Sequence, residues 1–197
     1  YESGTTSYTF TVGVSDGASE ADAQYTVKVG DVNDQTPVLD TSAGTSLKVN
    51  EDASKGTSVL TAKGSDGDGT SAHNTLAYRL KSLSVAGSFK ITSSSGVVSL
   101  ETALDYESNT KELKFTVVVS DGKSEVSAEY TVSVVDVNDK KPAFDSKGTY
   151  AVDLPENIAV DLGISTIKAS DNDGTSPNNA IVYTLKNTGG GTDISPL

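Results

Sequence analysis

The chain has 197 residues, with 27 acidic and 15 basic side chains and a formal net charge of -12. A surface this acidic repels nucleic acid and anionic lipid, so neither is expected as a partner. The chain contains no cysteine, which excludes disulfides, thiolate chemistry and cysteine-based zinc sites. It also has no apolar run of 18 residues, so we expect this segment to make no membrane contact.

An internal repeat organises the chain. Residues 1–34 align without a gap to residues 106–139, and 22 of the 34 positions are identical. A match of this length indicates tandem repeats. We therefore expect the C-terminal part of one repeat at 1–36, a complete repeat at 37–141 and the N-terminal part of a third at 142–197. Both outer parts should expose core-facing residues and promote aggregation or end-to-end association.

Short strands with a period of two follow in chain order through the complete repeat. We expect them at residues 47–49, 59–62, 76–80, 89–91 and 97–100, separated by turns that contain Gly and Asp. Later, Phe115, Val117 and Val119 alternate with Lys114, Thr116 and Val118, and residues 130–134 alternate in the same way. Such alternation places one face of each strand on a core. The predicted fold is all-β, with tandem Greek-key β-sandwich repeats of the immunoglobulin type.

Acidic residues gather in short motifs around the ends of these strands. Within the complete repeat they are Glu51, the pair Asp66 and Asp68, the pair Asp105 and Glu107, Asp121 in a turn, and the run Asp136, Asn138 and Asp139. Calcium takes six to eight hard oxygen ligands, which carboxylates, Asn amides and backbone carbonyls provide. The alternative is that these acids are solvated turn residues, as any lone Asp-Gly would be.

Four of these motifs resemble those of cadherin repeats. Residues 104–107 read Leu-Asp-Tyr-Glu, similar to the cadherin Leu-Asp-Arg-Glu, with Tyr106 in place of Arg. Residues 136–139, Asp-Val-Asn-Asp with Pro142 beyond them, resemble the Asp-x-Asn-Asp-x-x-Pro linker. Residues 155–157 and 171–173 resemble Pro-Glu-Asn and Asp-x-Asp. The motifs occur in the family's order, and the resemblance covers essentially the whole chain.

The resemblance implies that motifs from consecutive repeats converge at each joint and hold three calcium ions. At the first joint, the implied ligands are Glu2, Asp31, Asn33, Asp34, Asp66, Asp68 and Asp121, with carbonyls of Val32, Gln35 and His73. At the second joint, they are Glu51, Asp105, Glu107, Asp136, Asn138, Asp139, Asp171 and Asp173, with carbonyls of Val137, Lys140 and Asn178. Lys140 and Lys141 depart from the family pattern, and their ammonium groups should weaken the affinity for calcium.

The function implied by the resemblance is a calcium-binding, calcium-rigidified extracellular segment of a cell-adhesion or surface scaffold protein. The parent protein would be membrane-anchored, and its adhesion homophilic. Expected partners are other cell-surface or extracellular proteins, a second copy of the chain among them. An alternative from another class is a carbohydrate-binding repeat of a secreted enzyme or bacterial adhesin.

Catalysis by this segment is not expected. Residues 13–17 match the Gly-x-Ser-x-Gly elbow of hydrolases, but that elbow requires a following helix and a histidine partner. A second strand is predicted there instead, and His73, the only histidine, is expected in a solvent-exposed loop. The sequence therefore favours a binding and structural role.

Overall fold

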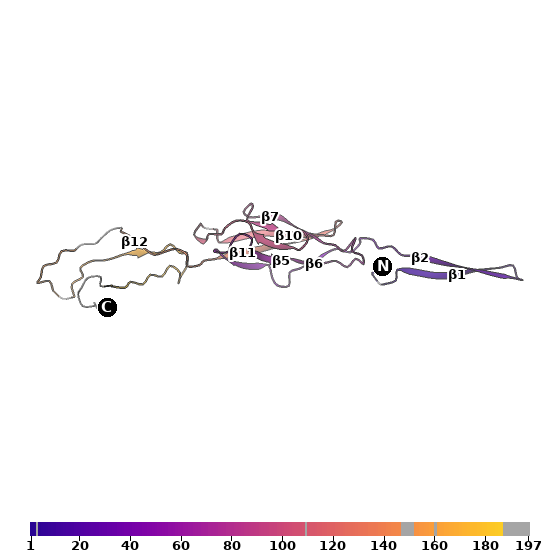
Figure 1. Ribbon diagram of the computed structural model, residues 1–197, viewed down its shortest axis with the longest axis horizontal. Coiled ribbons are helices and arrows are strands. Elements are labelled where there is room, and N and C mark those ends of the chain that lie inside the picture. The colour runs from indigo at the N-terminus through magenta and orange to yellow at the C-terminus, as the bar shows by residue number, and fades with distance from the viewer. Residues whose placement is uncertain (3, 109, 147–151, 160, 187–197) are drawn as a thin grey trace.

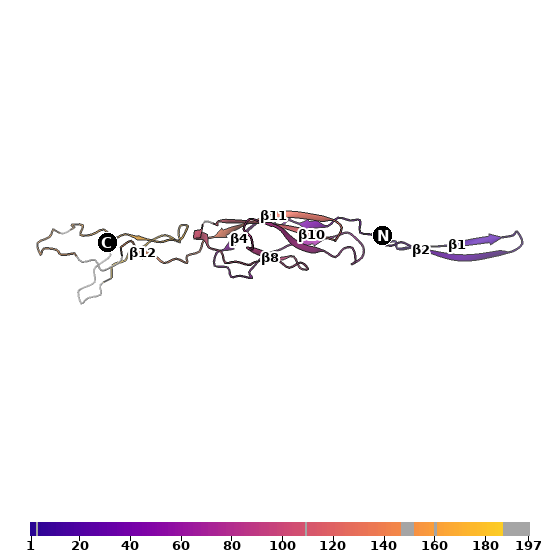
Figure 2. The same ribbon diagram turned by 90° about the horizontal axis from the view of Figure 1, so that it is seen from above.

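The molecule is an elongated rod with three consecutive parts. The structure, a computed structural model, describes residues 1–2, 4–108, 110–146, 152–159 and 161–186. A β-hairpin lies at one end, a β-sandwich in the middle, and the segment that begins with β12 at the other end (Figures 1 and 2). This order is the one expected of tandem repeats. The boundaries expected at residues 37 and 142 remain predictions.

The central sandwich is built from one four-stranded sheet and two smaller ones. The larger sheet has the order β4 (Ser46–Asn50), β11 (Glu125–Val135), β10 (Glu112–Ser120), β7 (Ala77–Leu83). A three-stranded sheet has the order β5 (Ser58–Thr61), β9 (Val97–Leu100), β8 (Phe89–Ile91). A two-stranded sheet consists of β3 (Val38–Asp40) and β6 (Lys63–Ser65). β4 pairs with β11 in parallel and the other pairs are antiparallel. The all-β Greek-key prediction is confirmed.

The core of the sandwich follows the predicted alternation. Phe115, Val117 and Val119 of β10 are buried, as is Tyr130 of β11. The centroid of the Phe115 ring lies 4.8 Å from that of the Phe89 ring and 5.6 Å from that of the Tyr130 ring. Val118 differs from the expectation, because it is also buried although it points to the outer face. β10 has a neighbouring strand on each side, with Arg79 and Ser127 opposite Val118, so little of this short side chain reaches water.

Local pattern located most of the strands of the sandwich but not all of them. β8 and β9 have the predicted bounds, β4 and β5 lie within one residue of theirs, and β7 begins one residue later and ends three residues later than predicted. The short strands β3 and β6 were missed, as was the single 3-10 turn η1 (Tyr106–Ser108). β3 and β6 have three residues each and pair only with one another. Neither has apolar residues at alternate positions, as β8 has in Phe89 and Ile91.

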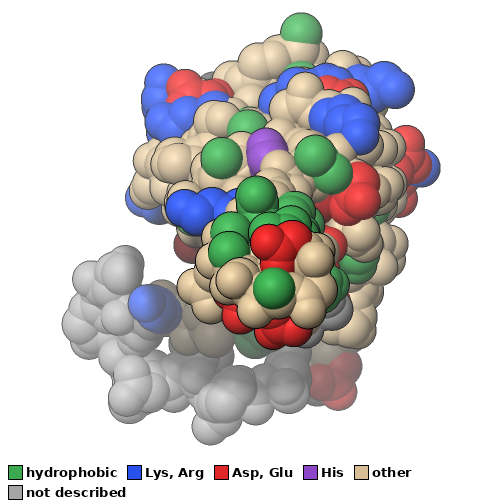
Figure 3. Space-filling model, turned by 90° about the vertical axis from the view of Figure 1, so that its right-hand side faces the viewer, with side chains coloured by type: hydrophobic (Ala, Val, Ile, Leu, Met, Phe, Trp, Pro, Cys, Tyr) green, Lys and Arg blue, Asp and Glu red, His purple; other side chains and the backbone are tan. Residues whose placement is uncertain are grey.

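The N-terminal hairpin resembles β10 and β11 in sequence but does not have their environment. β1 (Ser7–Ser15) pairs with β2 (Glu20–Lys28), and Phe10 lies opposite Tyr25 as Phe115 lies opposite Tyr130. Phe10 and Tyr25 are 49% and 52% exposed, whereas their counterparts are each 1% exposed. Figure 3 shows apolar and acidic side chains together on the end of the molecule that carries this hairpin.

The C-terminal part also exposes apolar side chains. β12 (Ala143–Phe144) pairs with β13 (Ala169–Ser170), and these two-residue strands are the only ones after β11 among the described residues. Exposed apolar side chains here include Phe144, Leu154 and Val182. No helix within the described ranges has the length and apolar character that crossing a membrane requires.

Self-association of the chain should depend on the apolar face of the hairpin. We expect the weight-average mass in sedimentation equilibrium to rise with concentration, because large contiguous apolar surfaces associate. Replacing Phe10 and Tyr25 together by serine should reduce this rise, whereas replacing the exposed polar Thr9 and Thr26 of the same strands by serine should leave it unchanged. A mass that stays monomeric at every concentration would contradict the expectation.

Candidate functional site at the repeat joints

The first joint is assembled from the segment after β2, the loop after β6 and the turn between β10 and β11. Asp68, at the centre, is 3% exposed. Its Oδ1 accepts hydrogen bonds from the backbone amides of Asp34 at 3.2 Å and Gln35 at 3.1 Å. Asp66 Oδ1 accepts from the amide of Asp68 at 2.9 Å. The bonds from Asp34 and Gln35 hold the chain that leaves the hairpin against a loop of the central sandwich.

Asp31 connects the two sides of this joint and remains ionised. Its Oδ2 accepts hydrogen bonds from the Thr70 amide at 2.9 Å and the Thr70 hydroxyl, and lies 3.0 Å from His73 Nδ1. The Thr70 hydroxyl, followed by the side chains of His73 and Glu2, lowers the pKa of Asp31 to about 2. The backbone amides of Ser124 and Lys123 similarly lower the pKa of Asp121. Carboxylates held in the charged form are suited to binding a cation.

The second joint repeats this arrangement at an offset of 105 residues. Asp173, which is 4% exposed, accepts hydrogen bonds from the amides of Asp139 at 3.2 Å and Lys140 at 3.0 Å. Asp136 Oδ2 accepts from the hydroxyl of Thr175 and, at 3.1 Å, from the side-chain Nδ2 of Asn178. These two side chains, Thr175 first, lower the pKa of Asp136. Equivalent bonds at both joints show that the geometry is encoded by the repeat.

Glu51 adds a buried carboxylate to the second joint. It follows β4 directly and is 4% exposed. Oε2 accepts the amide of Tyr106 at 2.6 Å, and Oε1 accepts the amide of Val137 at 2.9 Å. One carboxylate thus fixes the start of η1 and the segment after β11, which places Asp105 and Glu107 beside the joint.

Carboxylates from both sides of each joint come together closely enough to share a cation. Four sets have one oxygen per residue mutually within 4.8 Å: Glu2, Asp31 and Asp68; Asp66, Asp68 and Asp121; Glu51, Asp105 and Glu107; Glu107, Asp136 and Asp173. Several buried oxygens here have no hydrogen-bond partner, namely Asp31 Oδ1, Asn33 Oδ1, Asp66 Oδ2, Asp68 Oδ2, Asp121 Oδ2, Glu107 Oε2 and Asp173 Oδ2. Burying unpartnered carboxylate oxygens is costly, so these residues fit a hard cation such as calcium.

Three of the expected carboxylate ligands lie outside these four sets: Asp34, Asp139 and Asp171. Asn33 and Asn138 each donate across their joint, to the carbonyls of Asp121 and Asn178, at 3.4 Å. The carboxylate of Asp34 accepts from Gln35 Nε2 at 2.9 Å, and that of Asp139 lies 2.8 Å from Lys140 Nζ. The role of these residues as ligands remains a prediction, as does that of the residues in the four sets.

Some residues at the joints were not predicted as participants. The His73 ring was expected in a solvent-exposed loop, with only its carbonyl at the joint, but it is partly buried against Asp31. Thr70 and Thr175 were overlooked as hydroxyl donors to the acids. The signal for both threonines was available, because they occupy equivalent positions one repeat apart.

An apolar contact also joins neighbouring parts of the rod. A Cβ at Gly174 would lie 2.5 Å from ring atoms of Tyr106, and a Cβ at Gly69 would lie 2.5 Å from the ring of Tyr1. Only glycine allows this close approach. Lys111 Nζ lies 3.2 Å from the centroid of the Tyr106 ring, a cation–π contact that fixes the tyrosine found where cadherins have Arg.

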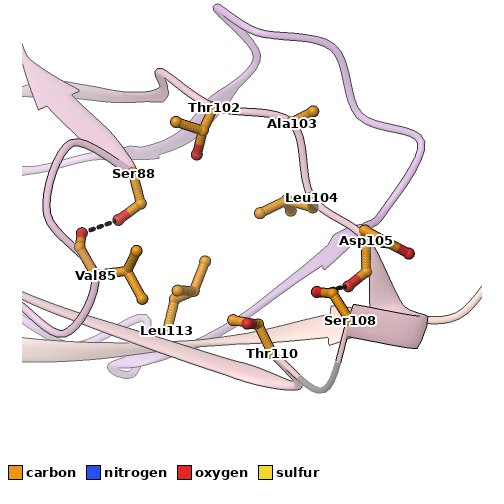
Figure 4. Close-up of a pocket in the computed structure, with 9 residues that line it drawn as sticks. All are labelled: Val85, Ser88, Thr102, Ala103, Leu104, Asp105, Ser108, Thr110 and Leu113. Carbon is orange, nitrogen blue, oxygen red and sulfur yellow. Dashed lines mark hydrogen bonds between the residues drawn. The ribbon is translucent and has the colours of Figure 1, made fainter.

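A cavity beside the second joint offers little to a substrate. It has a volume of about 120 Å³ and is lined mainly by short side chains, with Val85, Leu104 and Leu113 among them (Figure 4). Its serine hydroxyls are bonded within the chain, Ser88 to the carbonyl of Val85 and Ser108 to that of Asp105. Neither serine hydroxyl is therefore donated to a base.

Comparisons with known proteins agree with this geometry. The cadherin domain family matches residues 45–138. The chain is 35% identical over 173 residues to human cadherin EGF LAG seven-pass G-type receptor 2, covering 87% of this chain and 6% of the relative. It is 34% identical over 177 residues to human protocadherin Fat 1, covering 87% and 4%. The chain thus spans only a small part of these curated relatives.

A solved structure gives the same result for the fold. The chain superimposes on mouse cadherin-23 EC22-24 with a TM-score of 0.60 and 28% identity, over 91% of this chain and 57% of that one. Sandwich topology, acid motifs at the joints and sequence similarity all lead to one assignment. Residues 45–138 form a cadherin domain, and the chain is a cadherin-like repeat protein.

Proposed function

We propose that this chain is a calcium-rigidified segment of an extracellular cell-adhesion protein, in which calcium bound at each joint holds consecutive repeats in line. Membership of the family places the chain among extracellular adhesion repeats and not among enzymes. It does not favour the carbohydrate-binding alternative. The proposed partners are other cell-surface or extracellular proteins, second copies of the chain included.

The observation that carries this proposal is the set of buried oxygens without a hydrogen-bond partner, contributed from both sides of each joint. One of them, Glu107 Oε2, has an ion-pair contact with Lys140. At the first joint the proposed ligands include Asp31 from the hairpin side and Asp66, Asp68 and Asp121 from the sandwich. At the second they include Glu51, Asp105, Glu107 and Asp136 from the sandwich and Asp173 from the following segment.

Crowding of like charges explains how these residues would act. Two carboxylates about 4 Å apart repel by roughly 1 kcal/mol in water and about 4 kcal/mol at an effective dielectric constant of 20. The acids on either side of a joint therefore push the neighbouring parts of the rod away from one another. When bound, calcium would supply the positive charge that reverses this repulsion.

Calcium should raise the melting temperature of the chain. With a dissociation constant of about 10⁻⁴–10⁻³ M, typical of extracellular modules, about 10 mM calcium should raise it by roughly 5–15 °C. Thermal unfolding followed by circular dichroism across a calcium titration measures this shift. Magnesium at equal concentration controls for ionic strength, since Mg²⁺ demands a smaller and stricter octahedral site.

Paired variants at equivalent positions test whether the joints are the sites. Asp136→Ala/Asp139→Ala removes acids from the second joint, and Asp31→Ala/Asp34→Ala removes their counterparts from the first. Each should abolish part of the calcium-dependent rise, and the combination should abolish nearly all of it. A calcium response that is absent in the original chain, or unchanged in the combined variant, would refute the proposal.

A further inference from the structure

We infer that Lys140 is a tethered cation of the second joint: its ammonium group occupies the acid cluster, steadies the joint without metal and lowers its affinity for calcium. This inference rests on the proposed function of the joints. It distinguishes the second joint from the first and assigns the difference to one side chain.

The contacts of Lys140 carry the inference. Its Nζ lies 2.8 Å from Asp139 Oδ1, 3.1 Å from Glu107 Oε2 and 3.9 Å from Asp105 Oδ1. Glu107 Oε2 is among the buried oxygens without a hydrogen-bond partner, so its nearest compensation is this charge. The Lys140 side chain is 34% exposed and that of Glu107 is 17% exposed, so the contact with Glu107 is the least screened of the three. One ammonium group thus approaches three acids that the proposal assigns to calcium.

The backbone holds Lys140 in this position. Its amide donates to Asp173 Oδ1, the buried acid on the other side of the joint. The side chain therefore starts from a fixed point at the centre of the joint.

The first joint provides an internal comparison. Gln35 occupies the equivalent position, and its amide donates to Asp68 Oδ1 at 3.1 Å as that of Lys140 does to Asp173. Its neutral side chain bonds Asp34 Oδ1 at 2.9 Å. Lys123, also near this joint, bonds the carbonyl of Asn33 and forms no ion pair with an acid among the described residues. The two joints thus share a backbone arrangement and differ in the side chain at this position. Glu2, the counterpart of Glu107, also has a positive group beside it, the N-terminal ammonium of Tyr1 at 3.4 Å.

This difference affects the joint in opposite ways with and without metal. In the absence of calcium, the ammonium group offsets part of the repulsion among the acids, so the second joint should be straighter than the acids alone would allow. When calcium binds, the same group must be displaced or must remain as a like charge beside the ion. Replacing Lys140 with glutamine should therefore loosen the metal-free joint and tighten calcium binding.

Calcium binding at the second joint alone tests the second effect. In a chain that carries Asp31→Ala/Asp34→Ala, isothermal titration calorimetry compares Lys140 with Lys140→Gln. We expect Lys140→Gln to bind calcium about tenfold more tightly, as expected for removing one partly screened like charge. Lys141→Gln is the matched control, because Lys141 is exposed and forms no ion pair within the described part of the chain. It should change the affinity less than twofold.

The reverse substitution and a measurement without metal complete the test. Gln35→Lys, in a chain that carries Asp136→Ala/Asp139→Ala, should weaken calcium binding at the first joint by about tenfold. Without calcium, spin labels on Ser127→Cys and Thr166→Cys report the distribution of distances across the second joint by double electron–electron resonance. This distribution should become broader in Lys140→Gln but not in Lys141→Gln. The chain has no cysteine of its own, so both labels are unique.

The outcomes separate this inference from the proposed function. Equal calcium affinities for Lys140 and Lys140→Gln, or an equal gain with Lys141→Gln, would overturn the inference while leaving calcium binding intact. If neither joint binds calcium, the proposed function fails, and the spin distances still decide whether Lys140 steadies the joint. Unchanged distances would then overturn that part as well.

Discussion

Phe115→Ala is expected to lower the free energy of unfolding of the central sandwich by about 3–5 kcal/mol. The Phe115 ring is 1% exposed and packs between those of Phe89 and Tyr130. Its removal takes away both the burial of an aromatic side chain and its ring contacts, and leaves a cavity. Urea unfolding followed by far-ultraviolet circular dichroism measures the change.

The N-terminal hairpin contains the matched control for this substitution. Phe10 is followed by Thr-Val, as Phe115 is, and faces Tyr25 as Phe115 faces Tyr130, but it is 49% exposed. Phe10→Ala should change the free energy of unfolding of the sandwich by less than about 0.5 kcal/mol. Phe115→Ala is expected to remove much of the free energy of unfolding of a small domain. Phe115→Leu is therefore a useful second variant, because it should lower that free energy less. Equal losses for Phe10→Ala and Phe115→Ala would contradict the packing described above.

Glu51→Ala should destabilise the central sandwich by about 2–4 kcal/mol even without calcium. The substitution leaves the amides of Tyr106 and Val137 without their acceptor, and each unsatisfied buried donor costs about 1–3 kcal/mol. It should also weaken calcium binding at the second joint at least tenfold, because affinity depends on the number of charged ligands. Urea unfolding in a chelator and calorimetric titration with calcium measure the two effects.

Two further variants separate the structural and the metal-binding parts of this effect. Glu51→Gln keeps one carbonyl acceptor and removes the charge that Asp105 and Glu107 repel, so it should cost less stability than Glu51→Ala. It should still lose calcium affinity. Glu156→Gln, at the equivalent position one repeat later, changes an exposed glutamate and should leave the second joint unaltered. If Glu51→Ala and the original chain unfold with the same midpoint urea concentration, the two hydrogen bonds contribute nothing to the stability of the sandwich.

Much of the architecture could be predicted from the sequence because its causes are local. The 105-residue repeat revealed the tandem organisation without any knowledge of the fold. Alternation of apolar and polar residues identified β10 and β11, since side chains along a strand point to opposite faces. The acid motifs indicated the joints for a similar reason: they recur at fixed distances from the strand ends that position them. Whether they bind calcium remains to be measured.

Other features were decided by contacts between residues far apart in the chain. Phe10 and Phe115 have nearly the same local sequence, yet only Phe115 is covered, because β4, β5, β7, β8 and β9 pack around its hairpin. The parallel pairing of β4 with β11 joins positions more than 80 residues apart. No local pattern contains that information, since burial and strand pairing depend on which distant segments meet.

The environment of the Lys140 ammonium group at the second joint was also decided by the tertiary structure. The sequence placed Lys140 next to an acid motif, but did not show whether its ammonium group points to water or into the acids. The tertiary structure directs it toward Glu107 and Asp105, because the Lys140 amide is anchored to Asp173 of the following segment. In the same way, Tyr106 departs from the family motif in sequence, and only its packing on Gly174 explains how the joint accommodates it. The sequence by itself thus determined the repeat, the strands and the position of the acids, and the tertiary structure decided which side chains those acids meet, because such contacts depend on how separate repeats pack together.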